Sequence, residues 1–186
     1  MDRDEALRRA AAGPPLRGEN LAGIDLSGAV LAGADLSGTD LSGANLSRCD
    51  LAGADLTGAR LKRAQCLKTD FRQAVLRGTD LHAAFFNEAD LREADLRGAN
   101  LRFAKFPGAD WTGAQVDGAA YDAMTRLDPK DLPLLKRMKR VGPASPPFIR
   151  PAAGLPPGTT HDERSPPTNT GSSCTAPTPA RAPRKP

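Results

Sequence analysis

A strict five-residue period is the feature that most constrains the fold of this chain. Every fifth residue from Leu16 to Tyr121 is apolar, which gives 22 consecutive positions. Fifteen of these positions are Leu, and the others are Cys66, Phe71, Phe86, Phe106, Trp111, Val116 and Tyr121. A helix places side chains with a period of 3.6 and a strand with a period of 2, so neither element explains the pattern.

The residues before each large apolar position are equally regular. The residue two positions earlier is Ala in 15 cases, and the residue between is Asp or Asn in 13 of 22 cases. Side chains two apart on an extended segment point to the same side, so Ala and Leu should face inward and Asp outward. The two remaining residues would then turn a corner.

Each five-residue unit therefore predicts one short extended edge and one bend. Four right-angle bends close a square of 20 residues, and the next coil can stack on it at the β-sheet spacing of about 4.7–4.9 Å. The inward column predicts a core that includes Leu36, Leu41, Leu46, Leu51, Leu56, Leu61, Phe71, Phe86, Phe106 and Trp111.

The tandem A-(D/N)-L-x-x pattern resembles the pentapeptide repeat family. Residues 118–129 also resemble a closing segment of that family, through Tyr121, Asp122 and Thr125 in a YDxxT pattern. The resemblance implies an all-β fold, a right-handed quadrilateral β-helix over residues 16–125. It supplies the hand of the coil and its closure, which the spacing alone does not fix.

The corners raise a question of backbone conformation. Gly occupies the second corner position in 13 of 22 repeats, which suits a positive φ. Residues such as Arg48, Lys68 and Phe103 occupy others. We therefore expect that a positive φ is not required at every corner. Asp and Asn before the Leu should brace the corner by accepting hydrogen bonds from nearby backbone amides.

The segments outside the repeats predict caps and a tail. Residues 1–15 read as a capping helix or lead-in, because 3–11 contain good helix formers and Gly13-Pro14-Pro15 follows. Residues 126–140 predict a C-terminal capping helix, with Asp131 as its N-cap and with Leu134, Leu135 and Met138 on one side. A dimer contact or a basic amphipathic segment is the alternative. Residues 141–186 hold 12 prolines, which predicts a disordered basic tail.

The sequence offers no catalytic motif, no metal-ligand spacing and no cofactor site. Cys49 and Cys66 fall on inward positions and are expected to be inert packing residues, while His82 is outward with no nucleophile near it. No run approaches the ~18 apolar residues of a membrane span, and the N-terminus lacks a signal-peptide core. We expect a cytoplasmic, non-enzymatic protein, although a non-standard export route stays open.

An acidic ladder gives the first functional hypothesis. Residues 20 apart should stack, so Asp50, Asp70, Asp90 and Asp110 form a column, with Asp35, Asp55 and Asp95 on the next wall. Some members of the resembled family present acidic walls to DNA gyrase or topoisomerase as DNA mimics. Two observations weigh against this here. Arg72 and Arg92 fall on the same wall, and residues 16–121 carry a net charge of only −2.

A basic surface gives the second hypothesis. It consists of cations that map to two adjacent walls, namely Arg60, Lys62, Arg63, Arg77, Arg97 and Arg102. A solvated face is the ordinary explanation, and a docking patch for an acidic protein or a nucleic acid is the sharper one. Without interleaved aromatic residues in the sequence, specific nucleic-acid readout is not supported.

The predicted function is that of a non-catalytic scaffold, a rigid rod that binds a protein partner of unknown identity. The alternatives are a gyrase-binding or topoisomerase-binding DNA mimic, and an effector or adaptor module of a bacterial secretion or toxin system.

Overall fold

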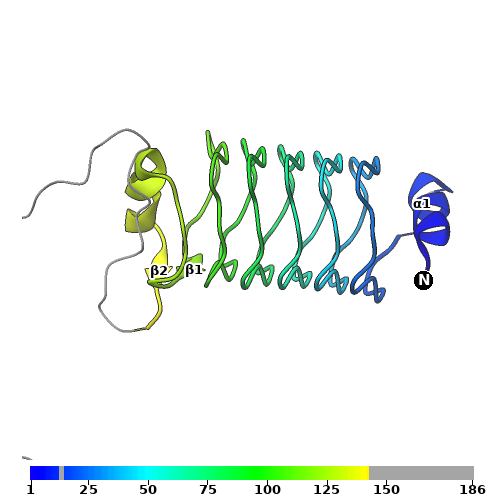
Figure 1. Ribbon diagram of the computed structural model, residues 1–186, viewed down its shortest axis with the longest axis horizontal. Coiled ribbons are helices and arrows are strands. Elements are labelled where there is room, and N and C mark those ends of the chain that lie inside the picture. The colour runs from blue at the N-terminus through cyan, green and yellow to red at the C-terminus, as the bar shows by residue number, and fades with distance from the viewer. Residues whose placement is uncertain (13–14, 143–186) are drawn as a thin grey trace, which may run out of the picture. The chain divides into compact units, whose positions relative to one another are not determined.

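Parallel β-bridges between residues 20 apart organise the whole repeat region. The computed structural model describes residues 1–12 and 15–142. The bridges run in unbroken series, for example from Asp50 to Asp70, from Asp70 to Asp90 and from Asp90 to Asp110. Figure 1 shows the resulting stack of coils, with α1 (Arg3–Ala12) at the N-terminal end. The coiled β-fold predicted from the period is therefore present, and its right hand stays a prediction from the resemblance.

Backbone hydrogen bonds join each coil to the next in the same way at every edge. The Leu51 N–H donates to the Asp70 carbonyl at 2.8 Å, and the Asp70 N–H donates to the Cys49 carbonyl at 3.0 Å. The Ala54 N–H donates to the Leu51 carbonyl at 3.1 Å and closes the corner as a four-residue turn. Each edge is so short that one residue forms the bridge.

The bridged columns define four walls, whose names we keep below. Wall 1 contains residues 20, 40, 60, 80, 100 and 120, and wall 2 contains residues 25, 45, 65, 85, 105 and 126. Wall 3 contains residues 30, 50, 70, 90 and 110, and wall 4 contains residues 35, 55, 75, 95 and 115.

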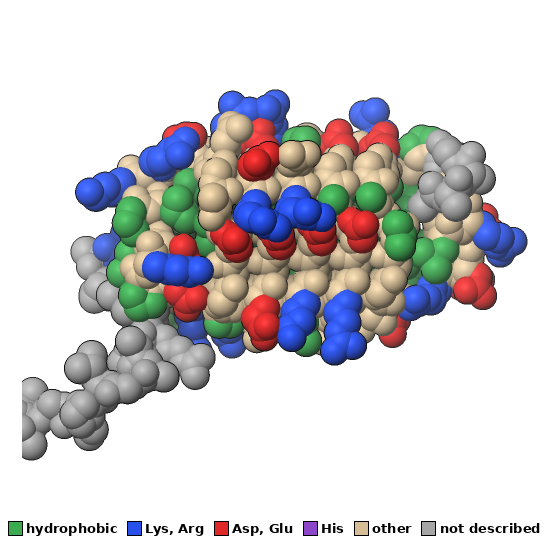
Figure 2. All heavy atoms as spheres, turned by 90° about the horizontal axis from the view of Figure 1, so that it is seen from above, with side chains coloured by type: hydrophobic (Ala, Val, Ile, Leu, Met, Phe, Trp, Pro, Cys, Tyr) green, Lys and Arg blue, Asp and Glu red, His purple; other side chains and the backbone are tan. Residues whose placement is uncertain are grey.

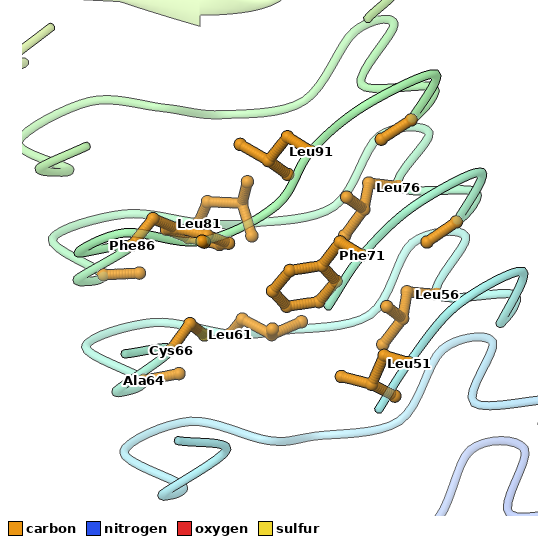
Figure 3. Close-up of a cluster of buried hydrophobic side chains, with 14 of the residues drawn as sticks. Leu51, Leu56, Leu61, Ala64, Cys66, Phe71, Leu76, Leu81, Phe86 and Leu91 are labelled. Carbon is orange, nitrogen blue, oxygen red and sulfur yellow. The ribbon is translucent and has the colours of Figure 1, made fainter. Parts of the chain in front are cut away.

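The interior is a continuous apolar column. The ten side chains expected to face inward are all buried, and Figure 3 shows those between Leu51 and Leu91 converging on the centre. Aromatic rings replace leucines in the later coils. The Phe86 and Phe106 rings stack at 4.9 Å, and the Phe106 ring contacts that of Trp111 at 4.8 Å.

Three buried threonines at the small inward position have their hydroxyls bonded. Thr39, Thr69 and Thr79 donate to main-chain carbonyls of the preceding coil at 2.9, 2.7 and 2.9 Å. A buried hydroxyl without a partner would be costly, so these bonds explain how Thr replaces Ala here.

The predicted bracing of the corners by Asp and Asn is confirmed. In each case the side-chain Oδ1 accepts a hydrogen bond from the amide two residues later, as Asp50 does from Ala52 at 3.0 Å. The full set is Asn20, Asp25, Asp35, Asp40, Asn45, Asp50, Asp55, Asp70, Asp80, Asp90, Asp95, Asn100 and Asp110.

The expectation about the corners was wrong. The second residue of each corner has a positive φ throughout, from Gly18 to Gly118. Eight of these residues are not glycine, such as Phe103 at 61°. The hydrogen bonds between coils explain this result, because the N–H of the second corner residue must point at the next coil. Non-glycine side chains accept the left-handed conformation there at a cost of roughly 1 kcal/mol each.

Helix α1 contacts the first coil. The Arg3 guanidinium donates to the carbonyls of Asp25 and Ser27 at 3.0 and 2.9 Å, and Arg9 bonds the Glu19 carboxylate at 2.9 Å. Ala6, within the helix, is fully buried. These contacts supply donors to carbonyls that no earlier coil could reach.

The repeat register ends with a one-residue insertion, which the sequence analysis did not detect. Lys105 bridges Arg126, 21 residues later, rather than residue 125. Asp122 accommodates the extra residue, because its carboxylate accepts hydrogen bonds from the amides of Phe103, Met124 and Thr125 at 3.2, 3.0 and 3.0 Å. Burial opposes ionisation, yet these bonds lower the pKa of Asp122.

The C-terminal segment differs from the predicted helix. It forms a 3₁₀ helix, η1 (Pro129–Lys136), followed by β2 (Lys139–Arg140), which pairs in parallel with β1 (Ala120–Tyr121). Asp128 stands at the N-cap in place of Asp131, because Pro129 lacks an N–H and fits the first helical turn. Met138 is buried but follows the helix.

No helix within residues 1–12 and 15–142 is long and apolar enough to cross a membrane. The tail that the sequence predicts to be disordered lies outside the described part of the chain from residue 143 onward.

Leu56→Ala should lower the free energy of unfolding by about 2–5 kcal/mol, because Leu56 is fully buried between coils. Leu56→Asp should cost more, since it also buries a charge. Chemical denaturation measures both changes. An unchanged unfolding midpoint in Leu56→Asp would show that this side chain does not face inward.

Gly53→Ala should destabilise the chain by about 1 kcal/mol, because Gly53 has φ 66° and a Cβ there would meet nothing within 4 Å. The whole free-energy cost then comes from placing Ala in a left-handed backbone conformation. Ala83→Gly, at φ 58°, should have the opposite sign. Equal stability of both variants and the parent would contradict the requirement for positive φ.

Candidate interaction surfaces

The acidic column of wall 3 is stacked as predicted but is paired with arginines. Arg72 Nε and Nη2 donate to the Asp70 carboxylate at 2.9 and 2.6 Å, and Arg92 binds Asp90 in the same way. Arg72 Nε also lies 3.8 Å from Asp90 Oδ2 in the next coil. Figure 2 shows a face where a row of acidic side chains runs along the coils with basic side chains beside it.

These ion pairs change the charge that wall 3 presents. The Arg72 side chain lowers the pKa of Asp70 by hydrogen bonding, so the carboxylate stays ionised and paired. Arg92 extends the chain of charges to Asp110 at 3.8 Å. Asp50 has no ion pair among the described residues. The wall is therefore a lattice of alternating charges from Asp70 onward rather than a uniform acidic strip.

Wall 4 holds a largely enclosed carboxylate that forms two ion pairs. Asp95 is only 7% exposed and receives Arg97, at 2.9 Å to Nε, together with Arg77 from the coil before. The hydrogen bonds from Arg97 and then Arg77 hold the pKa of Asp95 well below its usual range, although burial opposes them. These two arginines belong to the predicted basic surface and are thus already engaged.

The remaining cations of the predicted basic surface lie along wall 1 and its corner. Lys62 Nζ pairs with Asp80 at 3.2 Å, and Arg102 Nε lies 3.6 Å from Asp122 Oδ2. Arg60 and Arg63 have no ion pair within the described part of the chain. The structure thus brings the predicted cations together on adjacent walls but leaves two of the six without a carboxylate.

Wall 2 contains features that the sequence analysis missed. Phe85 and Leu67 are 39% and 38% exposed, and Lys105 Nζ lies 4.8 Å from the centre of the Phe85 ring. Phe103, 40% exposed, contacts the ring of His82 at 5.1 Å. Aromatic side chains therefore do lie among the cations. The available signal was the loss of Asp and Asn at 65, 85 and 105, which are 20 residues apart.

The two thiols within the described residues are unsuited to nucleophilic chemistry. Cys49 and Cys66 are free and buried, and burial raises the pKa of Cys49 to about 12 and that of Cys66 further. Such thiols are poor nucleophiles. Among residues 1–12 and 15–142, no group of three or more His, Cys, Asp or Glu could hold a metal ion.

Comparison with known protein families gives one strong match. The family profile described as pentapeptide repeats matches residues 16–48, 40–78 and 74–113, with eight copies. These ranges together cover more than half of the chain. No curated protein sequence matches significantly.

Solved structures of such repeat proteins are also similar. The pentapeptide repeat protein alr5209 from Nostoc PCC 7120 is 30% identical, covering 75% of this chain and 96% of its own, with a TM-score of 0.37. Rfr23 from the cyanobacterium Cyanothece 51142 is 24% identical, covering 65% and 96%, with a TM-score of 0.40. Full-length QnrB1, a plasmid-mediated fluoroquinolone resistance protein, is 20% identical, covering 76% and 88%, with a TM-score of 0.29.

Acidification should destabilise the chain below about pH 4. An unfolded Asp binds a proton near pH 3.9, whereas the folded Asp95 has a lowered pKa. The ionised Asp95 therefore contributes to the free energy of unfolding above that pH, and this contribution is lost as the pH falls. Asp95→Asn keeps an oxygen for the corner and should flatten this dependence between pH 6 and pH 3.

The control is Asp50→Asn, which also keeps the corner oxygen but removes no ion pair among the described residues. Denaturant unfolding at several pH values gives the comparison. A full acid-induced loss of stability in Asp95→Asn, as large as in the parent, would remove Asp95 as a cause.

Proposed function

The chain belongs to the pentapeptide repeat family, and we propose that it is a non-catalytic scaffold that presents fixed rows of side chains to a protein partner. This proposal assigns the chain a role in protein binding and no catalytic activity. Both rest on the surface described above.

One observation carries the proposal. Backbone bonds between coils, such as that from the Leu51 N–H to the Asp70 carbonyl, hold each outward side chain directly over the one 20 residues away. Binding to such columns costs little further backbone entropy, because the backbone that carries the side chains is already ordered. A partner can therefore be recognised by a long, pre-organised surface.

DNA mimicry is less well supported. B-DNA carries one charge per ~1.7 Å of axis, and a mimic needs a comparably uncompensated acidic wall. Arg72 and Arg92 pair with Asp70 and Asp90 on wall 3, and residues 16–121 have a net charge of −2. The pairing supports a scaffold over a gyrase-binding or topoisomerase-binding mimic.

The C-terminal segment supports capping over dimerisation. Leu134 and Leu135 pack against the core, and Leu127 and Met138 are buried there. Those apolar groups are thus used within the chain. A homodimer formed through residues 126–140 would have to displace them.

The scaffold proposal is tested by affinity capture with the full chain immobilised in its native form. A specific partner should be retained by the parent and lost by Leu56→Asp, because the columns exist only in the folded stack. Reconstitution with the purified partner should reproduce the difference at least tenfold in Kd. Equal retention by both forms would show that the folded surface is not what binds.

A gyrase supercoiling assay tests the DNA-mimic alternative. The scaffold proposal expects no protection and no salt-sensitive inhibition by micromolar purified chain. Clear protection, made stronger by Arg72→Ser with Arg92→Ser, would replace the scaffold with the mimic.

A further inference from the structure

Wall 2 departs from the bracing pattern in consecutive coils. Gln65, Phe85 and Lys105 stand in the column where Asp or Asn would brace the corner, and the bridges join them directly. None of the three accepts the bracing hydrogen bond, so the amides of Leu67 and Asn87 have no acceptor within the described residues. The fold does not require these side chains. At positions 65 and 85 an Asp would supply a hydrogen bond of about 0.5–1.5 kcal/mol, whereas at 105 it would find no amide to brace, because residue 107 is Pro.

A shallow hollow lies over this part of wall 2. Its lining consists of Arg63, Gln65, Cys66, Leu67, Phe85 and Asn87. Leu67 and Phe85 are each more than a third exposed, and both are apolar members of this lining. The amides of Gln65 and Asn87 can donate and accept hydrogen bonds beside it. An apolar hollow flanked by a few polar groups is typical of a site that takes one apolar side chain.

Two cations at the rim lack carboxylate partners among the described residues. Arg63 stands at the corner between walls 1 and 2, at φ 56°, and Lys105 lies over the Phe85 ring at 4.8 Å. The nearby Lys68 is different, because it pairs with Glu88 at 3.3 Å. The rim therefore offers two positive charges to a ligand.

From this arrangement we infer that the wall 2 hollow binds an acidic peptide segment with one apolar side chain. The apolar side chain fills the space between Leu67 and Phe85, and flanking carboxylates pair with Arg63 and Lys105. The inference rests on the proposed function and names the chemistry of the partner. Charge complementarity and the exposed apolar floor select this occupant.

A single-stranded nucleic acid fits the same surface less well. Bases would need an open aromatic face, but Lys105 lies over one face of Phe85, and Phe103 is in contact with His82. A peptide can instead place its few charges against Arg63 and Lys105.

Two substitutions remove the site while restoring residues that the repeat prefers. Phe85→Asp restores a bracing oxygen, and Arg63→Gly relieves a positive φ. Both variants should therefore fold, with melting temperatures no lower than that of the parent. Gln115→Asp is the matched control, because it restores the same brace on wall 4 and makes the same change from a neutral residue to Asp.

The probe is a random 12-residue peptide library displayed on phage and selected on the full native chain. Enriched peptides should share one Leu or Phe flanked by Asp or Glu. A synthetic fluorescein-labelled copy of the best peptide should bind Phe85→Asp and Arg63→Gly at least tenfold more weakly by fluorescence anisotropy. It should bind Gln115→Asp like the parent.

Three outcomes would overturn the inference. The first is enrichment of peptides whose binding survives Phe85→Asp, which leaves the scaffold proposal intact but moves the site. The second is failure to enrich any peptide, which counts against peptide binding by this hollow, while the capture experiment decides the scaffold separately. The third is tight binding of a 20-residue oligothymidine that Phe85→Asp abolishes, because it would assign the hollow to nucleic acid.

Discussion

The backbone hydrogen bonding that stacks each coil on the next is the constraint on which the rest of this structure depends. It orients the amide at each corner, and so it imposes a positive φ on Gly53 and on Arg48 alike. It also points one small and one large side chain inward from every edge. Stability in such a stack is approximately a sum over neighbouring coils, which makes the caps at both ends necessary.

The period alone predicted most of the fold. The inward column, the four walls and the bracing role of Asp50 and its equivalents followed from the alternation of side chains along an edge. The positive φ at the corners did not follow, because Arg48 and Phe103 are not residues that favour it. The hydrogen bond made by the corner amide, and not the residue type, imposes this conformation. The one-residue insertion before Arg126 and the 3₁₀ helix also depend on tertiary contacts, which a repeat pattern does not contain.

The candidate sites were predicted less well than the fold. Columns of like charge could be read from the sequence, but the pairing of Asp95 with two arginines could not, since it depends on side-chain rotamers. Wall 2 was missed because its residues are unlike one another. What Gln65, Phe85 and Lys105 share is the absence of a bracing oxygen, and that absence separates residues explained by the fold from residues that need another explanation.

Amide hydrogen exchange measured residue by residue tests the central claim most directly. The stacking amides of Lys68 and Glu88 donate to the next coil at 2.9 and 2.8 Å and should be strongly protected. The amides of Leu67 and Asn87, one residue earlier, have no acceptor among the described residues and should exchange fast, while the braced amide of Ala52 should be slower. Uniform protection across wall 2, or protection without a five-residue period, would contradict the account.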